Sequence, residues 1–115
     1  MFCSGKLYYD LEEARETTGN DSVAIIRVEQ FYPFHTELFK RVVAPYRGAA
    51  EIVWAQEETL NRGGWSYMNP RLAELFPDRE VRYVGRGPSA SPATGSPGVH
   101  REEQAALVRE ALTLD

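Results

Sequence analysis

Charged and hydroxyl side chains gather where predicted strands give way to turns. The segment 86–97 reads RGPSASPATGSP, which combines an arginine with small hydroxyls and backbone N–H donors. It runs directly into a predicted helix, and the unpaired N–H groups of a helix start favour an anion. Lys6 follows the Ser4-Gly5 turn in the same way. This pattern suggests anion binding or docking against another protein surface. The ligand or interface candidates here are Lys6, Arg86, Ser89, Ser91 and Thr94.

A pair of carboxylates, Glu57 and Glu58, follows a predicted strand over 51–56. Paired carboxylates can transfer protons or bind a metal, but more often they form ion pairs. We therefore take Glu57 as an interface candidate. The two histidines, His35 and His100, fall in different elements, and no spacing typical of zinc ligands surrounds them. No nucleophile, base and orienting group stand together. The sequence thus predicts no catalytic, cofactor-binding or metal-binding residue.

Aromatic side chains follow a glycine hinge at Gly63-Gly64, where Trp65 and Tyr67 stand close together. Aromatic residues beside glycines can anchor a protein interface. Packing of Trp65 in the core is an equally good interpretation.

Composition places the chain among compact proteins. A length of 115 residues suits one domain, and 43% hydrophobic with 11% aromatic residues argues against disorder. The net charge of -4 argues against a nucleic-acid partner. The single cysteine, Cys3, cannot form an internal disulfide and is predicted to lie in the core. No apolar run reaches the ~18 residues of a membrane span, so we expect no membrane partner. No secretory signal is visible, which favours the cytoplasm or an organelle matrix.

Strands and helices are predicted to alternate along the chain. The expected strands are 2–4, 23–28, 51–56 and 81–84. The run 23–28 is rich in β-branched residues, as in a parallel strand covered on both faces. Alternation of this kind predicts an α/β domain with a mostly parallel sheet. Ligands of such sheets usually meet the carboxyl ends of the strands.

Apolar spacing predicts the helices. Leu7, Leu11 and Ala14 share one helical face, and a second helix carries apolar residues at 38, 39, 42 and 43. Asn69-Pro70 resembles an N-cap and first turn, which predicts a short helix through Leu75. The last helix is expected over 99–113. Its apolar stripe is predicted to comprise Ala105, Val108 and Leu112.

Four segments together resemble one family. They are CSGKLYYDL at 3–11, VAIIRVEQFYPF at 23–34, WAQEE at 54–58 with the Gly64-Trp65 pair, and YVGR at 83–86 running through SASPATG to VH at 99–100 and EQ at 103–104. In this order they are similar to the C-terminal domain of the thiamine diphosphate-dependent, decarboxylating component of 2-oxoglutarate dehydrogenase. The similarity covers essentially the whole chain.

The resemblance implies a fold and a setting. It implies a three-layer α/β domain like the transketolase C-terminal domain, with a mixed sheet that is parallel except for an edge strand. In the full enzyme, thiamine diphosphate and magnesium bind in earlier domains, outside this chain, and a succinyl group passes to the lipoyl-bearing succinyltransferase component. The last domain packs at the dimer interface. Such enzymes work in the bacterial cytoplasm or the mitochondrial matrix. Some members bind a regulatory nucleotide or acyl-coenzyme A near this domain, and Lys6 and Gln30 match the family pattern.

We therefore expect residues 1–115 to be a single domain of a longer enzyme, inactive alone, whose role is structural and at the dimer interface. One alternative is a stand-alone anion- or nucleotide-binding module that uses Lys6, Arg86 and the 89–96 loop. Another is an assembly module, which should expose an apolar patch. A 2-oxoadipate substrate also stays open, because the substrate pocket would lie outside this chain.

Overall fold

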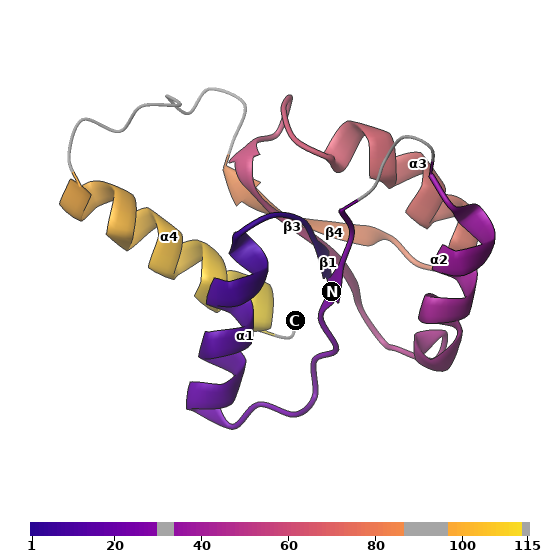
Figure 1. The fold of residues 1–115 in the computed structure, drawn as a ribbon, viewed down its shortest axis with the longest axis horizontal. Coiled ribbons are helices and arrows are strands. Elements are labelled where there is room, and N and C mark those ends of the chain that lie inside the picture. The colour runs from indigo at the N-terminus through magenta and orange to yellow at the C-terminus, as the bar shows by residue number, and fades with distance from the viewer. Residues whose placement is uncertain (30–33, 87–96, 114–115) are drawn as a thin grey trace.

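The fold alternates strands and helices along the whole chain (Figure 1). The computed structural model describes residues 1–29, 34–86 and 97–113. Its elements are β1 (Phe2–Cys3), α1 (Leu7–Thr18), β2 (Ile26–Arg27), α2 (Thr36–Val43), a 3-10 turn η1 (Ala44–Tyr46), β3 (Ile52–Thr59), α3 (Trp65–Leu75), β4 (Val81–Arg86) and α4 (Pro97–Leu112).

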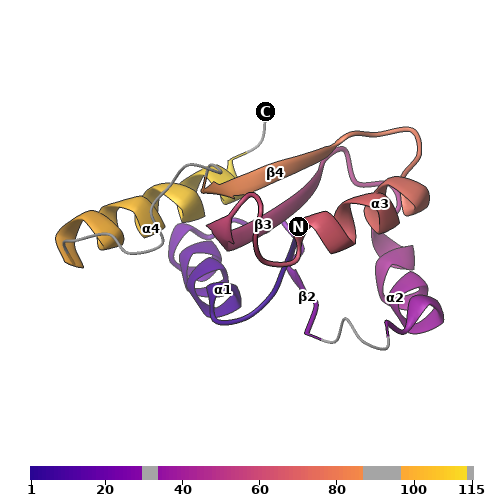
Figure 2. The same cartoon turned by 90° about the horizontal axis from the view of Figure 1, so that it is seen from above.

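The strands form one four-stranded sheet in the order β2-β1-β3-β4. All pairings between described strands are parallel, with Phe2 opposite both Ile26 and Trp54 and with Ile52 opposite Val81. Helices α1 and α4 cover one face of the sheet, and α2 and α3 cover the other (Figure 2). The predicted three-layer α/β fold is confirmed. The antiparallel edge strand that the resemblance implied is not found within the described ranges.

Each face of the sheet has its own apolar core. Trp54 of β3 lies fully buried among Phe39, Met68 and Leu72 from α2 and α3. The opposite face packs the side chains of Cys3, Leu7, Leu11, Val53, Ala55, Val84, Leu107, Val108 and Ala111. Adjacent residues of β3 thus alternate between the two cores, as the two-residue period of a strand requires. The predictions that Cys3 lies in the core and that Leu7 and Leu11 form the inner face of a helix are confirmed.

The end of α1 shows how the local sequence shapes the chain. Gly19 has φ 67°, a left-handed conformation that glycine adopts without strain. Its N–H donates to the carbonyl groups of Arg15 and Glu16, which closes the helix.

The strand predictions were wrong in length. The predicted strand 23–28 is reduced to Ile26–Arg27, because its neighbour β1 spans only Phe2–Cys3. It lies at the edge of the sheet with Arg27 exposed, so it is not covered on both faces. Strand β3 is longer than predicted and includes Glu57 and Glu58.

Two helix predictions were wrong in detail. Pro70 lies inside α3, which begins at Trp65, so Asn69-Pro70 does not start the helix. The helix runs through the proline because Met68 and Leu72 are both fully buried, while Ser66, whose carbonyl loses its partner, is exposed to water. In α4 the buried residues are Leu107, Val108 and Ala111, so the predicted stripe is shifted. Ala105 is exposed.

No helix within the described ranges is long and apolar enough to cross a membrane.

Candidate functional site

The carboxyl ends of the strands bring two predicted site residues together. Lys6 follows the turn after β1, and Glu57 lies near the end of β3. Lys6 Nζ donates a hydrogen bond of 3.0 Å to Glu57 Oε1. This hydrogen bond raises the pKa of Lys6 above its ordinary value and favours its charged form. The Lys6 ammonium therefore has a partner within the chain, although its side chain is 74% exposed and stays in contact with water.

Gln104 of α4 completes this cluster. Its side-chain amide nitrogen donates to Glu57 Oε1 at 2.7 Å and to Asp10 Oδ2 of α1 at 2.9 Å. One amide thus links two carboxylates from different elements, and it does so where neither hydrogen bond is fully exposed to water. The arrangement fastens α1 and α4 to the end of β3.

Arg86, the last residue of β4, lies at the rim of the same cluster. Its guanidinium is 3.1 Å from a carboxylate oxygen of Glu103, on the residue before Gln104. The space that Glu57, Arg86, Glu103, Gln104 and Leu107 enclose has a volume of about 20 Å³. As the described residues form it, this space holds a single water molecule and is too small for a nucleotide or a diphosphate.

The other predicted site residues, Gln30, Ser89, Ser91 and Thr94, lie outside the described residues. Of the predicted set, the structure therefore brings together Lys6 and Glu57 directly, with Arg86 joining them through Glu103 and Gln104.

Gln56 is a key residue that sequence reasoning did not single out. It is only 1% exposed. Its side-chain carbonyl accepts hydrogen bonds from Trp54 Nε1 at 2.9 Å and from the Trp65 backbone N–H at 3.0 Å. Its amide nitrogen donates to the carbonyl groups of Thr59 and Arg62, both at 2.8 Å. Gln56 thus fixes the course of the loop between β3 and α3. The sequence offers little signal, because Gln56 ends the predicted strand and is followed directly by the polar residues Glu57 and Glu58.

Of the two interpretations of Trp65, an interface anchor or a core residue, the structure supports packing against the core. The side chain is half-buried, and its ring centroid lies 5.2 Å from that of Tyr83. Burial raises the pKa of Tyr83, which keeps its hydroxyl protonated at neutral pH and able to donate to the Arg86 carbonyl at 3.0 Å.

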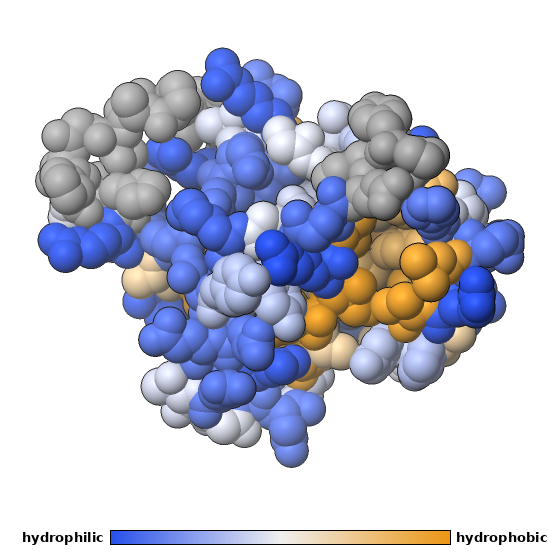
Figure 3. All heavy atoms as spheres, viewed as in Figure 1, coloured by the Kyte–Doolittle hydropathy of each residue, from blue (hydrophilic) through white to orange (hydrophobic). Residues whose placement is uncertain are grey.

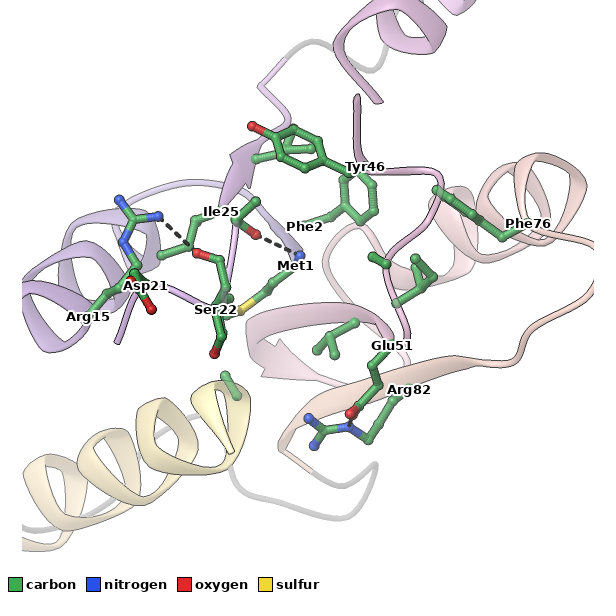
Figure 4. Close-up of a pocket in the computed structure, with 17 residues that line it drawn as sticks. Met1, Phe2, Arg15, Asp21, Ser22, Ile25, Tyr46, Glu51, Phe76 and Arg82 are labelled. Atoms are coloured by element: carbon green, nitrogen blue, oxygen red, sulfur yellow. Dashed lines mark hydrogen bonds and ion pairs between the residues drawn. The ribbon is translucent and has the colours of Figure 1, made fainter. Parts of the chain in front are cut away.

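A cavity of about 540 Å³ lies at the opposite, amino-terminal end of the sheet (Figure 4). Its walls mix apolar side chains such as Phe2 and Phe76 with charged ones. Both of its arginines bind within the chain: Arg15 donates to the Val23 carbonyl at 3.1 Å, and Arg82 pairs with Glu51 and donates to the Thr113 carbonyl at 2.8 Å. Arg82 therefore caps the end of α4, and the cavity offers shape rather than reactive chemistry.

A second cavity, of about 520 Å³, lies between α2 and α3. Lys40, Arg47 and Arg71 line it together with a single carboxylate, Glu74. The Arg71 guanidinium lies 3.5 Å from the centre of the Tyr67 ring. The excess of positive charge beside aromatic rings suits an anion that also carries a flat ring. Sequence analysis missed this site because its cations come from separate elements.

The sequence profile of the family described as "2-oxoglutarate dehydrogenase C-terminal" matches residues 1–112. The chain belongs to this family. Among its relatives, the 2-oxoglutarate dehydrogenase E1 component of Exiguobacterium sp. is 45% identical over 100% of this chain and 12% of the relative. That of Geobacillus kaustophilus is 46% identical over 98% of this chain and 12% of the relative. The mitochondrial 2-oxoglutarate dehydrogenase of Caenorhabditis elegans is 45% identical over 97% of this chain and 11% of the relative.

A solved structure supports the fold. A split gene transketolase, described as an inactive tetramer, matches this chain with a TM-score of 0.53 and 20% identity. The match covers 98% of this chain and 38% of the transketolase chain. This likeness confirms the transketolase-like α/β fold that the resemblance implied. The chain spans about 12% of the length of the bacterial relatives that it matches.

The strand-end cluster of this family member does not fit thiamine diphosphate. The space beside Lys6 and Glu57 has a volume of about 20 Å³. No group of three or more His, Cys, Asp or Glu side chains in the described ranges is arranged to hold a metal ion.

Proposed function

We propose that this chain works as the C-terminal, subunit-contact domain of a thiamine-dependent 2-oxoglutarate dehydrogenase, and that the chemistry takes place outside it. The observation that carries the proposal is the pairing at the strand ends. In most α/β enzymes this edge binds the ligand, yet here Lys6, Glu57 and Gln104 are bonded to one another.

The paired charges act as fasteners in this proposal. Glu57 joins the sheet to α1 and α4 through Lys6 and Gln104, and Arg86 joins β4 to α4 through Glu103. The polar network holds the two helices in place, so that the domain presents a fixed surface to the rest of the enzyme. Gln30, Ser89, Ser91 and Thr94 stay candidates for contact with a ligand or with that enzyme.

The family resemblance supports a proposal for the wider setting. The complete enzyme decarboxylates 2-oxoglutarate on thiamine diphosphate, with magnesium, in domains that precede this one. The succinyl group then passes to a lipoyl-bearing succinyltransferase. The relatives include bacterial and mitochondrial proteins, which supports the bacterial cytoplasm or the mitochondrial matrix as the setting.

The direct test is the release of CO₂ from 2-oxoglutarate by the purified chain with added thiamine diphosphate and Mg²⁺. We expect a rate equal to the protein-free control. The full-length Geobacillus kaustophilus relative serves as the positive control. Turnover by this chain alone, abolished when thiamine diphosphate is left out, would overturn the proposal.

The cavity between α2 and α3 supports a second, regulatory role. Three cations and the carboxylate of Glu74 line it, and one of the cations, Lys40, also lies 3.7 Å from the carboxylate of Glu37. The remaining positive charge suits a ligand that carries phosphate, such as a nucleotide or an acyl-coenzyme A. Calorimetric titration with AMP, acetyl-coenzyme A and inorganic phosphate tests this role. We expect binding that the Lys40→Ala/Arg47→Ala variant loses and that Lys6→Ala keeps. An absence of heat with all three ligands at millimolar concentration contradicts the role.

A further inference from the structure

The outer side of α2 carries a ridge of exposed apolar side chains. Leu38 is 53% exposed and Val42 is 44% exposed, and Tyr46 of η1, 43% exposed, continues the line. Because these residues recur at every fourth position, they form one ridge about 12 Å long. Three of the four large hydrophobic side chains that the described residues expose thus lie on this ridge. A concentration of this kind is typical of an interaction surface.

A groove runs beside this ridge. Leu38 and Val42 line a space of about 170 Å³ together with Ile26 of β2 and with Val28, which follows β2. Figure 3 shows hydrophobic side chains gathered over this part of the molecule. Ile26 also lines the cavity at the amino-terminal end of the sheet, and so does Tyr46. The ridge and the groove therefore form one apolar surface, which the apolar side of a partner helix can cover.

The charge beside the ridge is opposite in sign to that of the whole chain. Helix α2 and the turn that follows it carry Lys40, Arg41 and Arg47 against one carboxylate, Glu37, in a chain whose net charge is -4. Lys40 lies 3.7 Å from Glu37. Arg41 is exposed and forms no ion pair among the described residues. It lies one helical turn after Leu38, next to the ridge. A negatively charged partner is therefore attracted to this side of α2.

The surroundings of the ridge favour a helix over other partners. Side chains at every fourth position form the ridges that pack into the grooves of a second helix. An anionic membrane surface is disfavoured, because Glu29 lines the groove and Glu37 precedes the first residue of the ridge. The β2 side offers no net charge to a strand or a nucleic acid, since the side chains of Arg27 and Glu29 pair with each other at 2.6 Å.

We propose that the ridge of Leu38, Val42 and Tyr46 docks an acidic amphipathic helix of a separate protein. The partner helix packs its own apolar residues, spaced by four, against the ridge and into the groove beside Ile26. A carboxylate on its flank pairs with Arg41. Arg41 does not line the cavity that we propose for a phosphate-bearing ligand, so the two sites can be separated by substitution. The partner contact is a function additional to the structural role proposed above.

Fluorescence anisotropy with a labelled synthetic peptide tests the proposal. The probe is a helical peptide of about 18 residues, with leucines at every fourth position and glutamates beside them. We expect it to bind the purified chain with a Kd of about 10–100 μM. Leu38→Glu/Val42→Glu should weaken binding by about tenfold or more, because it places carboxylates against the apolar and acidic sides of the peptide. The matched control, Ala105→Glu/Ala106→Glu, adds the same charges at exposed positions of α4 and should bind like the unmodified chain. Circular dichroism checks that each variant is folded.

A charge exchange tests the pairing at Arg41. Arg41→Glu should weaken binding of the glutamate peptide and should favour a second peptide in which lysines replace the glutamates. A third peptide, with the same composition as the first but with its leucines scattered, should not bind. The proposal is overturned if the lysine peptide or the scattered peptide binds the unmodified chain as tightly as the first. It is also overturned if no peptide binds at about 1 mM, or if the chain binds vesicles of phosphatidylglycerol and phosphatidylcholine instead.

A last measurement distinguishes a separate partner from the rest of the enzyme. In the E1 component of Geobacillus kaustophilus, residues 1–115 of this chain can replace the corresponding segment. The glutamate peptide should bind this chimaera as it binds the purified chain. A folded chimaera that does not bind the peptide would show that earlier domains of the enzyme cover the ridge, which overturns the proposal. The proposed function is decided separately, by the decarboxylation assay.

Discussion

The side-chain amide of Gln104 lies 2.7 Å from the carboxylate of Glu57 and donates a hydrogen bond to it. The two residues are 47 positions apart in the sequence. Their contact joins the last helix to the strand at the centre of the fold, at the sheet edge where α/β enzymes usually bind their ligands.

Loss of this link should destabilise the domain. Gln104→Ala removes two hydrogen bonds to carboxylates, those with Glu57 and Asp10. We expect a loss of about 1–2 kcal/mol in the free energy of unfolding, because both contacts are partly open to water. Urea unfolding measures it, with Glu102→Ala, an exposed position on the same helix, as the control. Equal stability of the two variants would contradict the fastening role of Gln104.

The buried amide of Gln56 should matter more. Gln56→Leu leaves the indole N–H of Trp54 and the carbonyl groups of Thr59 and Arg62 without their partner. We expect a loss of about 2–4 kcal/mol, since each unsatisfied buried group is costly. Hydrogen exchange should also quicken in the 59–64 loop, an effect that Gln104→Ala should not produce. Unchanged exchange in that loop would show that Gln56 does not hold it.

Gly63 should not tolerate a side chain. Its φ is +70°, and an added Cβ would lie 2.7 Å from Glu58 Oε2 and 2.9 Å from Gln56 Oε1. We expect Gly63→Ala to cost about 1–3 kcal/mol through backbone strain and displacement of Gln56. Gly48→Ala is the matched control, because an added Cβ there meets nothing within 4 Å. Thermal unfolding of both variants measures the difference in stability between them. That difference disappears if the loop between β3 and α3 can shift freely.

The Cys3 thiol should make stability depend on alkaline pH. Burial raises its pKa from 9.0 to about 12. The unfolded chain loses this proton at lower pH than the folded chain, so the stabilisation is complete below about pH 9 and is lost as pH rises toward 12. The difference in unfolding free energy between the unmodified chain and Cys3→Ala should therefore narrow over that range.

Urea titrations at pH 8 and pH 10.5 measure this difference. A constant difference would contradict the burial of the thiol. At neutral pH the folded chain should also react slowly with thiol reagents and react fully once unfolded.

The sequence predicted the layers of the fold because local spacing decides them. Leu7 and Leu11 recur on one helical face, and both are fully buried. The apolar segment around Trp54 is buried on both faces because it lies in an inner strand of the sheet. Element boundaries were harder. Asn69-Pro70 has the local chemistry of a helix start, yet the burial of Met68 and Leu72 on either side of it extends the helix through the proline.

The sequence predicted where the candidate site lies, but not that its side chains bond to one another. The strand-end rule correctly brought Lys6 and Glu57 together. It could not indicate that Gln104, 47 residues from Glu57, would bond to the same carboxylate. The cavity lined by Lys40, Arg47 and Arg71 escaped prediction for the same reason, since its charges meet only after α2 and α3 pack together. Helix α2 was predicted from four apolar residues, of which Phe39 and Val43 are buried and Leu38 and Val42 are not.

The central claim is that this chain is the C-terminal domain of a 2-oxoglutarate dehydrogenase. Its most direct test replaces the corresponding segment of the Geobacillus kaustophilus E1 component, 46% identical to it, with residues 1–115 of this chain. The measurement is decarboxylation of 2-oxoglutarate by the chimaera, with the truncated enzyme as the negative control. We predict that the chimaera keeps its assembly state and activity within about tenfold of the parent, a change of about 1.4 kcal/mol in the barrier. A folded chimaera as inactive as the truncated enzyme would contradict the account.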